Sequence, residues 1–307
     1  MAKATLLLPA RSRFAAGNLP AQVATALGRA ERSLGTAGEA AQLRRHFNVQ
    51  PADWSAAALT RQTDAGDAAE GFWLRADPAS IVPDMQGARL MASAETLRLE
   101  QDDVDALLPA LQPLFAGFGY QLDAPTPARW YLRLPVDTPL PQFAEPEAVL
   151  GDDLFSHLPD GDNGRQWRGL LTEAQVVLHQ HPWNEQRVAA GKRAVNSLWF
   201  WGPGRLPESV STVHAQVRSR DALLQGLATL AGVRIGGEQT VDALVDLRQL
   251  RSLEQLTRDA ITPLLEAIRR GELAELQLDF EDGTGYRIRR WQRWQIWKKP
   301  QGTLVDD

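Results

Sequence analysis

The order of apolar and polar residues along the chain predicts short strands that alternate with amphipathic helices. Strands are predicted where apolar residues form short runs closed by Pro or Gly, and Leu90–Leu99 is a further candidate. The apolar runs that predict strands are 4–8, 72–77, 129–134 and 194–201. Near the carboxyl terminus, 276–280 and 285–290 flank Asp282-Gly283, a pair typical of a tight turn, and predict a β-hairpin.

Helices are predicted where apolar residues recur at every third or fourth position. The clearest is 165–179, in which Trp167, Leu171 and Leu178 share one face. The helices predicted in this way are 20–34, 102–118, 165–179, 221–230 and 257–270. Pro109 and Pro113 weaken the second of these, because each removes an amide donor and crowds the preceding turn. Strands that alternate with helices predict an α/β fold.

Composition limits the classes of protein to be considered. The 307 residues include 44% hydrophobic and 23% charged residues, the proportions of an ordinary globular protein. The formal net charge of −5 disfavours nucleic acid or an anionic membrane as a partner, but it leaves room for a local basic patch. The absence of cysteine excludes disulfides, thiolate metal ligands and thiol nucleophiles. No stretch has the length of a membrane span or a signal-peptide core, so a cytoplasmic location is expected.

A basic and aromatic stretch near the carboxyl terminus is a candidate interaction surface. Within Tyr286–Lys299, tryptophans recur every three residues beside arginines and lysines. Such a stripe can stack unpaired bases while the cations meet phosphates, or it can dock a protein. The structural alternative is a terminal helix whose tryptophans pack onto the domain. The candidate residues are Arg290, Trp291, Arg293, Trp294 and Trp297.

The segment 179–204 is rich in side chains that can bind an anion. A helix end followed by a Pro turn can present imidazole, amide and guanidinium groups to a ligand. His179 and His181 point to different faces of a helical frame, so they are poorly placed to chelate an ion together, and no metal site is predicted. In the structural alternative, Asn184 caps a short helix and Asn196 braces a strand.

The familiar signatures of catalysis are missing from the sequence. His46, His157 and His214 have no Ser or Asp partner at a recognised spacing. The chain contains neither the Gly-x-Ser-x-Gly elbow of serine hydrolases nor a phosphate-binding loop that ends in Gly-Lys-Ser/Thr. No catalytic residue and no cofactor are therefore assigned from the sequence.

The run from Leu178 to Gly202 resembles a segment of the archaeal-type, cofactor-independent phosphoglycerate mutases. In that family the segment reads His-Pro-x-Asn, then Arg, Gly-Lys and Asn-x-Ile-Trp-Leu-Trp-Gly. The residues that match are His181, Pro182, Asn184, Arg187, Gly191, Lys192, Asn196, Trp199, Trp201 and Gly202. The resemblance implies an alkaline-phosphatase-like α/β fold with two divalent metals and a nucleophilic Ser. It also suggests a single α/β unit over 1–307 with an inserted lobe at about 51–200.

Further stretches extend a likeness to nearly the full length of the chain. These are Trp73-Leu-Arg-Ala-Asp-Pro, Arg129-Trp-Tyr-Leu-Arg-Leu, the His-Pro-x-Asn run and the basic, tryptophan-bearing end. Together they resemble the bacterial RpfE-type regulatory family, whose members are often labelled phosphoglycerate mutases because of the shared segment. The resemblance implies a regulatory protein.

The chain departs from the mutase pattern where the metal ligands belong. Leu8 runs into Pro9-Ala-Arg-Ser where the family has an Asp-Gly ligand. The stretch Asp282-Gly-Thr-Gly-Tyr286 ends in Tyr where the family's late motif has a ligand His, and the chain contains no Asp-His dipeptide. Two-metal phosphoryl transfer depends on both ions. The departures therefore favour a catalytically degenerate relative.

We expect a reduced alkaline-phosphatase-like or phosphoglycerate-mutase-like scaffold that serves as a cytoplasmic regulatory or interaction protein without a metal or other cofactor. Its candidate partners are a phosphorylated small molecule and a protein. The candidate anion pocket comprises His181, Asn184, Arg187, Asn196, Arg75 and Arg133. Two alternatives stay open: an active metal-dependent phosphoryl-transfer enzyme, and a single-stranded nucleic-acid-binding accessory protein that uses Tyr286–Lys299.

Overall fold

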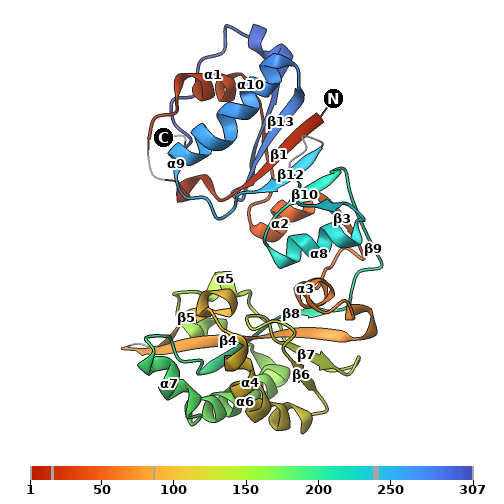
Figure 1. The fold of residues 1–307 in the computed structure, drawn as a ribbon, viewed down its shortest axis with the longest axis vertical. Helices are drawn as coiled ribbons and strands as arrows, with labels where there is room; N and C mark the ends of the chain where they lie inside the picture. Colours follow the sequence, from red (N-terminus) through yellow and green to blue (C-terminus); the bar gives the residue numbers. More distant parts are fainter. Residues whose placement is uncertain (1, 15–16, 86, 238–241, 306–307) are drawn as a thin grey trace. The chain divides into compact units, whose positions relative to one another are not determined.

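The computed structural model describes residues 2–14, 17–85, 87–237 and 242–305, and its contacts divide the chain into two compact units (Figure 1). Unit 1 comprises Met1–Ala52 and Glu208–Asp307, and unit 2 comprises Asp53–Pro207. Both units combine helices with a sheet, so the predicted α/β class is confirmed. A single α/β unit over 1–307 with an inserted lobe at about 51–200 stays a prediction. Within the described ranges, no helix is long and apolar enough to cross a membrane.

Unit 1 is built on a seven-stranded sheet in the order β11-β10-β12-β1-β13-β14-β2. The first five strands in that order are parallel, and β14 and β2 run antiparallel beside β13. The strands are β1 (Ala2–Leu8), β2 (Glu31–Leu34), β10 (Gln216–Arg218), β11 (Arg234–Ile235), β12 (Ala243–Asp246), β13 (Leu273–Phe280) and β14 (Thr284–Arg289). A second, two-stranded sheet pairs β3 (Phe47–Gln50) with β9 (Ser209–Thr212).

The helices of unit 1 supply apolar faces that cover the sheet. Leu27 of α1 and Ile268 of α10 pack in one core with Leu6 of β1, and Figure 1 shows the two helices side by side. The helical segments are α1 (Ala21–Arg29), α2 (Glu39–Arg44), α8 (Ala222–Leu230), α9 (Leu253–Gln255) and α10 (Thr262–Arg270), with a π-helical turn at Leu256–Ile261. Short 3₁₀ turns are η1 (Arg11–Arg13) and η6 (Arg290–Trp294).

Two of the sequence predictions for unit 1 have different outcomes. The hairpin is confirmed, because β13 and β14 pair antiparallel and Gly283 adopts a φ of 86° in the turn between them. A Cβ at this position would lie 2.1 Å from the carbonyl oxygen of Gly35, so the turn requires glycine. The helix predicted over 20–34 is wrong beyond Arg29: Ala30 is extended, and the chain then forms edge strand β2 against β14.

Unit 2 is built on an antiparallel sheet in the order β5-β4-β7-β6, with β8 also paired to β4. Its strands are β4 (Phe72–Asp84), β5 (Gly87–Ser93), β6 (Gln121–Asp123), β7 (Tyr131–Leu134) and β8 (Ser197–Gly204). Its helices are α3 (Ala56–Asp64), α4 (Gln101–Ala116), α5 (Pro146–Val149), α6 (Gly161–His179) and α7 (Trp183–Ala189), with 3₁₀ turns η2 (Ala68–Glu70), η3 (Ala94–Leu97) and η4 (Leu154–His157).

The main core of unit 2 lies between the sheet and the helices α4 and α6. Leu107 of α4 and Trp167 of α6 pack there against Leu74 of β4, and Figure 1 shows both helices on one side of that strand. The helix predicted over 102–118 is confirmed despite its two prolines, because α4 continues through both of them. The strand predicted over Leu90–Leu99 is wrong after Ser93, where the chain turns into η3.

Candidate functional site

The carboxyl ends of the parallel strands in unit 1 meet at one edge of the sheet, the position where α/β sheets commonly bind ligands. β12 ends at Asp246, and β13 carries Asp279 one residue before its end. Both residues are in register with Leu7 of β1, which lies between them. Residues in register on neighbouring parallel strands point to the same face of the sheet. The topology thus places two carboxylates on one face, on either side of β1.

Asp246 is paired with a buried arginine. Arg248, only 8% exposed, donates from Nε to Asp246 Oδ1 over 2.9 Å and from Nη2 to Oδ2 over 2.9 Å. The same guanidinium pairs with Glu39 and lies 3.6 Å from Oδ1 of Asp221. Burial would raise the pKa of Asp246, but the hydrogen bonds from Arg248 and Ser219 outweigh burial and hold it below its usual range. Arg248 thus pairs with Asp246 and Glu39 and also lies near Asp221.

Asp279 is held by a second arginine and by a histidine. Arg45 donates from Nε and Nη2 to the two carboxylate oxygens of Asp279 over 2.9 and 2.6 Å. His46 Nε2 lies 2.8 Å from Asp279 Oδ2, so Nε2–H donates to the carboxylate and Nδ1 of His46 accepts from His214 Nε2 over 3.1 Å. Burial and the neighbouring His46 lower the pKa of His214 to about 4. These residues form an Arg–Asp–His–His chain in which Asp279, His46 and His214 are buried.

Two further contacts close the same edge of the sheet. Gln42 is fully buried and donates from Nε2 to the last carbonyl of β1, that of Leu8, over 3.0 Å and to the carbonyl of Asp279 over 2.7 Å. Arg11 donates from Nε to Asp282 over 2.8 Å, in the turn after β13. Among the residues that the structure describes, no group of three His, Asp or Glu side chains could hold a metal ion.

The asparagines of the predicted anion pocket both brace the backbone of unit 2. Asn184 of α7 donates to the carbonyls of Leu178 and Val195 over 2.8 and 2.9 Å and accepts from the Val195 amide. Asn196 accepts from the amide of Ile81 over 2.8 Å and donates to its carbonyl over 2.7 Å. Their amide groups are therefore used to tie loops and strands together.

The arginines of the predicted pocket also have partners within unit 2. Arg187 lies 2.5 Å from a carboxylate oxygen of Asp103. Arg75, which is 3% exposed, donates from Nε and Nη2 to the two carboxylate oxygens of Asp77 over 2.8 and 2.9 Å. Arg133 donates to the carbonyl of Glu70 over 2.6 Å.

The strand pairing places two of these arginines on one face of the unit 2 sheet. Arg75 and Arg133 come from the paired strands β4 and β7, and Arg133 is in register with Trp73. His181, Asn184 and Arg187 instead belong to α7 and the turn before it, where His181 Nδ1 accepts from the Trp183 amide over 3.3 Å.

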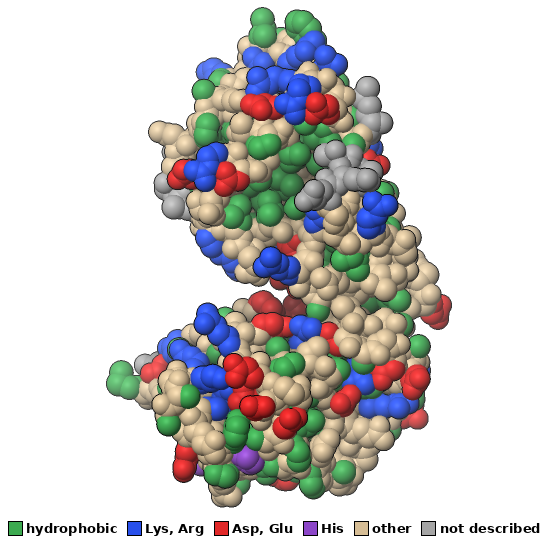
Figure 2. Space-filling model, in the orientation of Figure 1, with side chains coloured by type: hydrophobic (Ala, Val, Ile, Leu, Met, Phe, Trp, Pro, Cys, Tyr) green, Lys and Arg blue, Asp and Glu red, His purple; other side chains and the backbone are tan. Residues whose placement is uncertain are grey.

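The predicted interaction surface lies at the carboxyl-terminal end of unit 1. Trp291, Trp294 and Trp297 expose 54%, 68% and 75% of their surface, so the alternative in which these tryptophans pack onto the domain is wrong. Figure 2 shows Lys and Arg side chains gathered at the top of the view, where Figure 1 places this blue part of the chain. The stretch forms η6 and an irregular segment.

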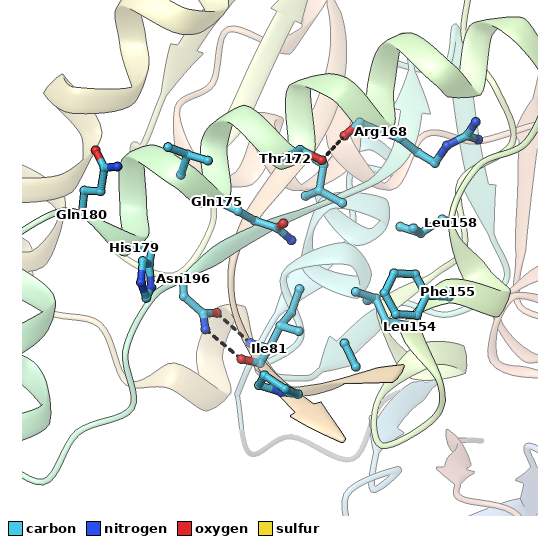
Figure 3. Close-up of a pocket in the computed structure, with 14 residues that line it drawn as sticks. Ile81, Leu154, Phe155, Leu158, Arg168, Thr172, Gln175, His179, Gln180 and Asn196 are labelled. Atoms are coloured by element: carbon cyan, nitrogen blue, oxygen red, sulfur yellow. Dashed lines mark hydrogen bonds between the residues drawn. The ribbon is translucent and has the colours of Figure 1, made fainter. Parts of the chain in front are cut away.

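A groove of about 670 Å³ runs along α6 in unit 2 (Figure 3). On one side, successive turns of α6 present Arg168, Thr172 and Gln175, and the other side is apolar and includes Leu154. Asn196 borders the groove, with its amide held by Ile81 as described above. The mixed lining suits a ligand with an apolar part better than a compact phosphate.

Sequence reasoning missed the buried histidine chain and the arginines at the sheet edge. His46 and His214 are 168 residues apart, and no spacing rule joins them to Asp279. The Asp246-Leu-Arg248 triplet did carry a signal, since it follows directly on an apolar strand run. An arginine two positions after an aspartate that ends a strand can turn back and pair with it, as the Arg248 amide and guanidinium do with Asp246.

Comparison with known proteins finds partial similarity to one kind of enzyme, and no family model matches the chain. The chain is 25% identical over 146 residues to a probable 2,3-bisphosphoglycerate-independent phosphoglycerate mutase of Geobacter sulfurreducens (46% of this chain, 35% of the relative). It is 31% identical over 106 residues to such a mutase of Methanothrix thermoacetophila (32% of this chain, 27% of the relative). The mutase of Methanosarcina mazei is 30% identical over 132 residues (40% of this chain, 33% of the relative).

Solved structures give similar findings at lower identity. The cofactor-independent phosphoglycerate mutase of Thermoplasma acidophilum matches with a TM-score of 0.40 and 12% identity, covering 94% of this chain and 89% of that one. The PH0037 protein of Pyrococcus horikoshii matches with a TM-score of 0.47 and 10% identity, covering 94% and 87%. The matched sequence spans about a third of the length of the curated relatives. The sequence matches confirm the predicted likeness to the mutases for part of the chain, and the RpfE-type likeness stays a prediction.

Proposed function

We propose that this chain is a regulatory or interaction protein on a phosphoglycerate-mutase-like scaffold, and that it acts by binding and not by phosphoryl transfer. The partial sequence similarity to the mutases supports the scaffold. The observation that carries the proposal is the pairing of Asp246 and Asp279, the two carboxylates beside β1, with Arg248 and Arg45. Each arginine occupies both oxygens of its carboxylate.

Divalent metal ions, which the mutase resemblance implies, do not fit this arrangement. A hard cation needs carboxylate oxygens that are free to coordinate it. At the described edge of the sheet, a cation on Asp246 would have to displace Arg248, which is 8% exposed. Leaving a buried charge without its partner costs about 3–5 kcal/mol. The carboxylates that could hold the ions are therefore committed to arginines, and no catalytic step is assigned to them.

The contacts of the predicted anion pocket argue against a phosphorylated small molecule as the ligand there. The six side chains predicted for an anion pocket make hydrogen bonds or ion pairs inside unit 2. A phosphate would compete with these contacts for the same side chains. Isothermal titration with 3-phosphoglycerate is expected to give no heat of binding. Saturable binding would restore the predicted pocket.

Assays of metal content and of turnover test the proposal together. The purified chain is dialysed against Mn²⁺ and then against metal-free buffer, and its metal content is measured by elemental mass spectrometry. It is also assayed for interconversion of 2- and 3-phosphoglycerate with Mn²⁺ present. We expect neither a retained ion nor turnover. About two retained ions per chain, the number in a two-metal site, with turnover that a chelator abolishes, would establish the enzyme alternative instead.

A further inference from the structure

Four large apolar side chains lie exposed within seven residues at the end of unit 1. Trp291, Trp294, Ile296 and Trp297, here called the tryptophan platform, expose 54%, 68%, 77% and 75% of their surface. Isolated exposed apolar residues are ordinary, but a contiguous group of this kind marks an interaction site. Tryptophan is also the residue most enriched where binding energy concentrates.

The local backbone arranges these side chains in rows. Arg290–Trp294 form the 3₁₀ helix η6, in which three residues make one turn and positions i and i+3 line up about 6 Å apart along the axis. Trp291 and Trp294 therefore lie on one side, and Arg290 and Arg293 form a neighbouring row. The guanidinium of Arg293 lies 4.7 Å from the centre of the Trp294 ring. In η6 the row of tryptophan rings thus lies directly beside the row of arginines.

The segment under the platform is anchored to unit 1. Gln292, 3% exposed, accepts from the Arg289 amide over 2.7 Å and donates to the Arg287 carbonyl over 3.2 Å. Lys298 donates to the carbonyl of Arg29 over 3.4 Å, and the amide of Gln301 donates to the carbonyl of Ala24 over 2.9 Å. The backbone that presents the rings is therefore held in place before any ligand arrives, which lowers the entropy cost of binding.

The charged residues of the segment that contains the platform are all basic. Residues 287–301 include six Lys and Arg but no Asp or Glu, whereas the whole chain has a net charge of −5. Arg287 and Arg289 pair with Glu275. In the part of the chain that the structure describes, the other four cations have no carboxylate within ion-pair distance; they are Arg290, Arg293, Lys298 and Lys299. The platform is complementary to an anionic ligand.

We infer that the tryptophan platform binds single-stranded nucleic acid. Unpaired bases stack on exposed aromatic rings regardless of sequence, and the interleaved cations meet the phosphates between them. A membrane is a poorer occupant, because inserting the ring of Trp294 would also desolvate the guanidinium that lies against it. Duplex DNA offers no free base faces to the rings. This inference rests on η6 and its flank and is independent of the proposed function.

Fluorescence anisotropy of a labelled oligothymidylate of about 15 nucleotides, titrated with the full chain, tests the inference. If four phosphates meet the four cations, log K falls with log[salt] with a slope of about −3, and affinity drops about fifty-fold between about 50 and 200 mM salt. Trp294→Ala is expected to weaken binding roughly five- to hundredfold. Trp297→Ala, at a residue with 75% exposure, provides a second aromatic variant that leaves the fold unchanged.

Matched variants separate stacking from charge. Arg293→Gln and Lys299→Gln are each expected to make the salt slope shallower by about 0.7. Phe118→Ala and Arg165→Gln change an exposed aromatic residue and an exposed cation in unit 2 and should leave binding unchanged. The inference is overturned if the oligonucleotide does not bind at 50 mM salt. It is also overturned if polyglutamate binds equally well and Trp294→Ala has no effect, or if only phosphatidylserine vesicles bind.

Discussion

In each unit an arginine is buried beside an aspartate two residues away in the sequence, but the two pairs lie in different places. In unit 2, Arg75 and Asp77 lie in the middle of β4, where Trp201 also donates to Asp77 over 2.7 Å. In unit 1, Asp246 and Arg248 lie where β12 ends, beside Asp221 and Glu39. The first pair braces a sheet from within. The second fills the edge at which a ligand would enter.

The contrast shows that an aspartate and an arginine two residues apart can have different roles, depending on where in the sheet they lie. Residues two apart on a strand point to the same face, so opposite charges at that spacing can pair wherever they are placed. In the middle of a sheet, the two side chains are buried and have to satisfy the hydrogen bonds of each other and of the polar groups around them. At the carboxyl edge, the arginine of such a pair keeps the carboxylate from binding a ligand or a metal ion. Four predictions test this difference, in order of expected effect.

Removing the arginine inside unit 2 should have the largest effect. Arg75→Ala leaves Asp77, which is fully buried, without its cation, and should lower the free energy of unfolding by about 3–5 kcal/mol. Urea denaturation measures the loss. The double variant Arg75→Met/Asp77→Leu removes both charges and should lose less. An equal or larger loss in the double variant would show that the pair itself stabilises the sheet.

Acid should weaken unit 1 through the histidine chain. Because the folded pKa of His214 is lowered to about 4, the unfolded chain binds more protons between that value and about 6.5, and stability falls as pH drops through this window. The full shift in the pKa of His214 corresponds to a loss of about 3 kcal/mol in the free energy of unfolding. Thermal unfolding from pH 7 to pH 4 measures it. His214→Asn should flatten this part of the profile, and an unchanged profile would exclude His214 as the cause.

Opening the edge of unit 1 should have a smaller effect on stability but a distinct chemical one. Arg248→Ala leaves Asp246 beside Glu39 and Asp221, whose side chains are 41% and 39% exposed, so the loss should be about 2 kcal/mol. Added Mn²⁺ should then raise the unfolding temperature of this variant but not that of the wild type.

Arg75→Ala is the control for this effect. Among the described residues, Arg75 forms an ion pair with Asp77 alone, so the variant leaves a single carboxylate and no second one to help bind Mn²⁺. Equal stabilisation of wild type and Arg248→Ala by Mn²⁺ would mean that Arg248 does not block a cation.

The smallest effect on stability is expected at the platform. Trp294 is 68% exposed, so Trp294→Ala should change the free energy of unfolding by no more than about 0.5 kcal/mol. Denaturation of this variant beside the wild type provides the measurement. A loss of several kcal/mol would mean that the ring packs in the core after all.

Much of the secondary structure was predictable because it depends on local pattern. The face of 165–179 that includes Trp167 is the face that α6 buries, and the turn at Asp282-Gly283 forms because its glycine adopts a positive φ. The limits of α1 were not predictable in this way. Residues 31–34 continue a weak helical pattern, but the free edge of β14 pairs with them as a strand.

The candidate sites show the same difference between features that depend on local sequence and features that depend on tertiary contacts. The sequence by itself determined the basic, tryptophan-bearing end and the closeness of Asp246 to Arg248, because these depend only on neighbours in the chain. Only the tertiary structure decided that Asp279 and His46, 233 residues apart, share a hydrogen bond and that His214 joins them. Contacts across such separations form when whole strands and helices pack, and apolar burial, which carries no information about particular polar partners, drives that packing.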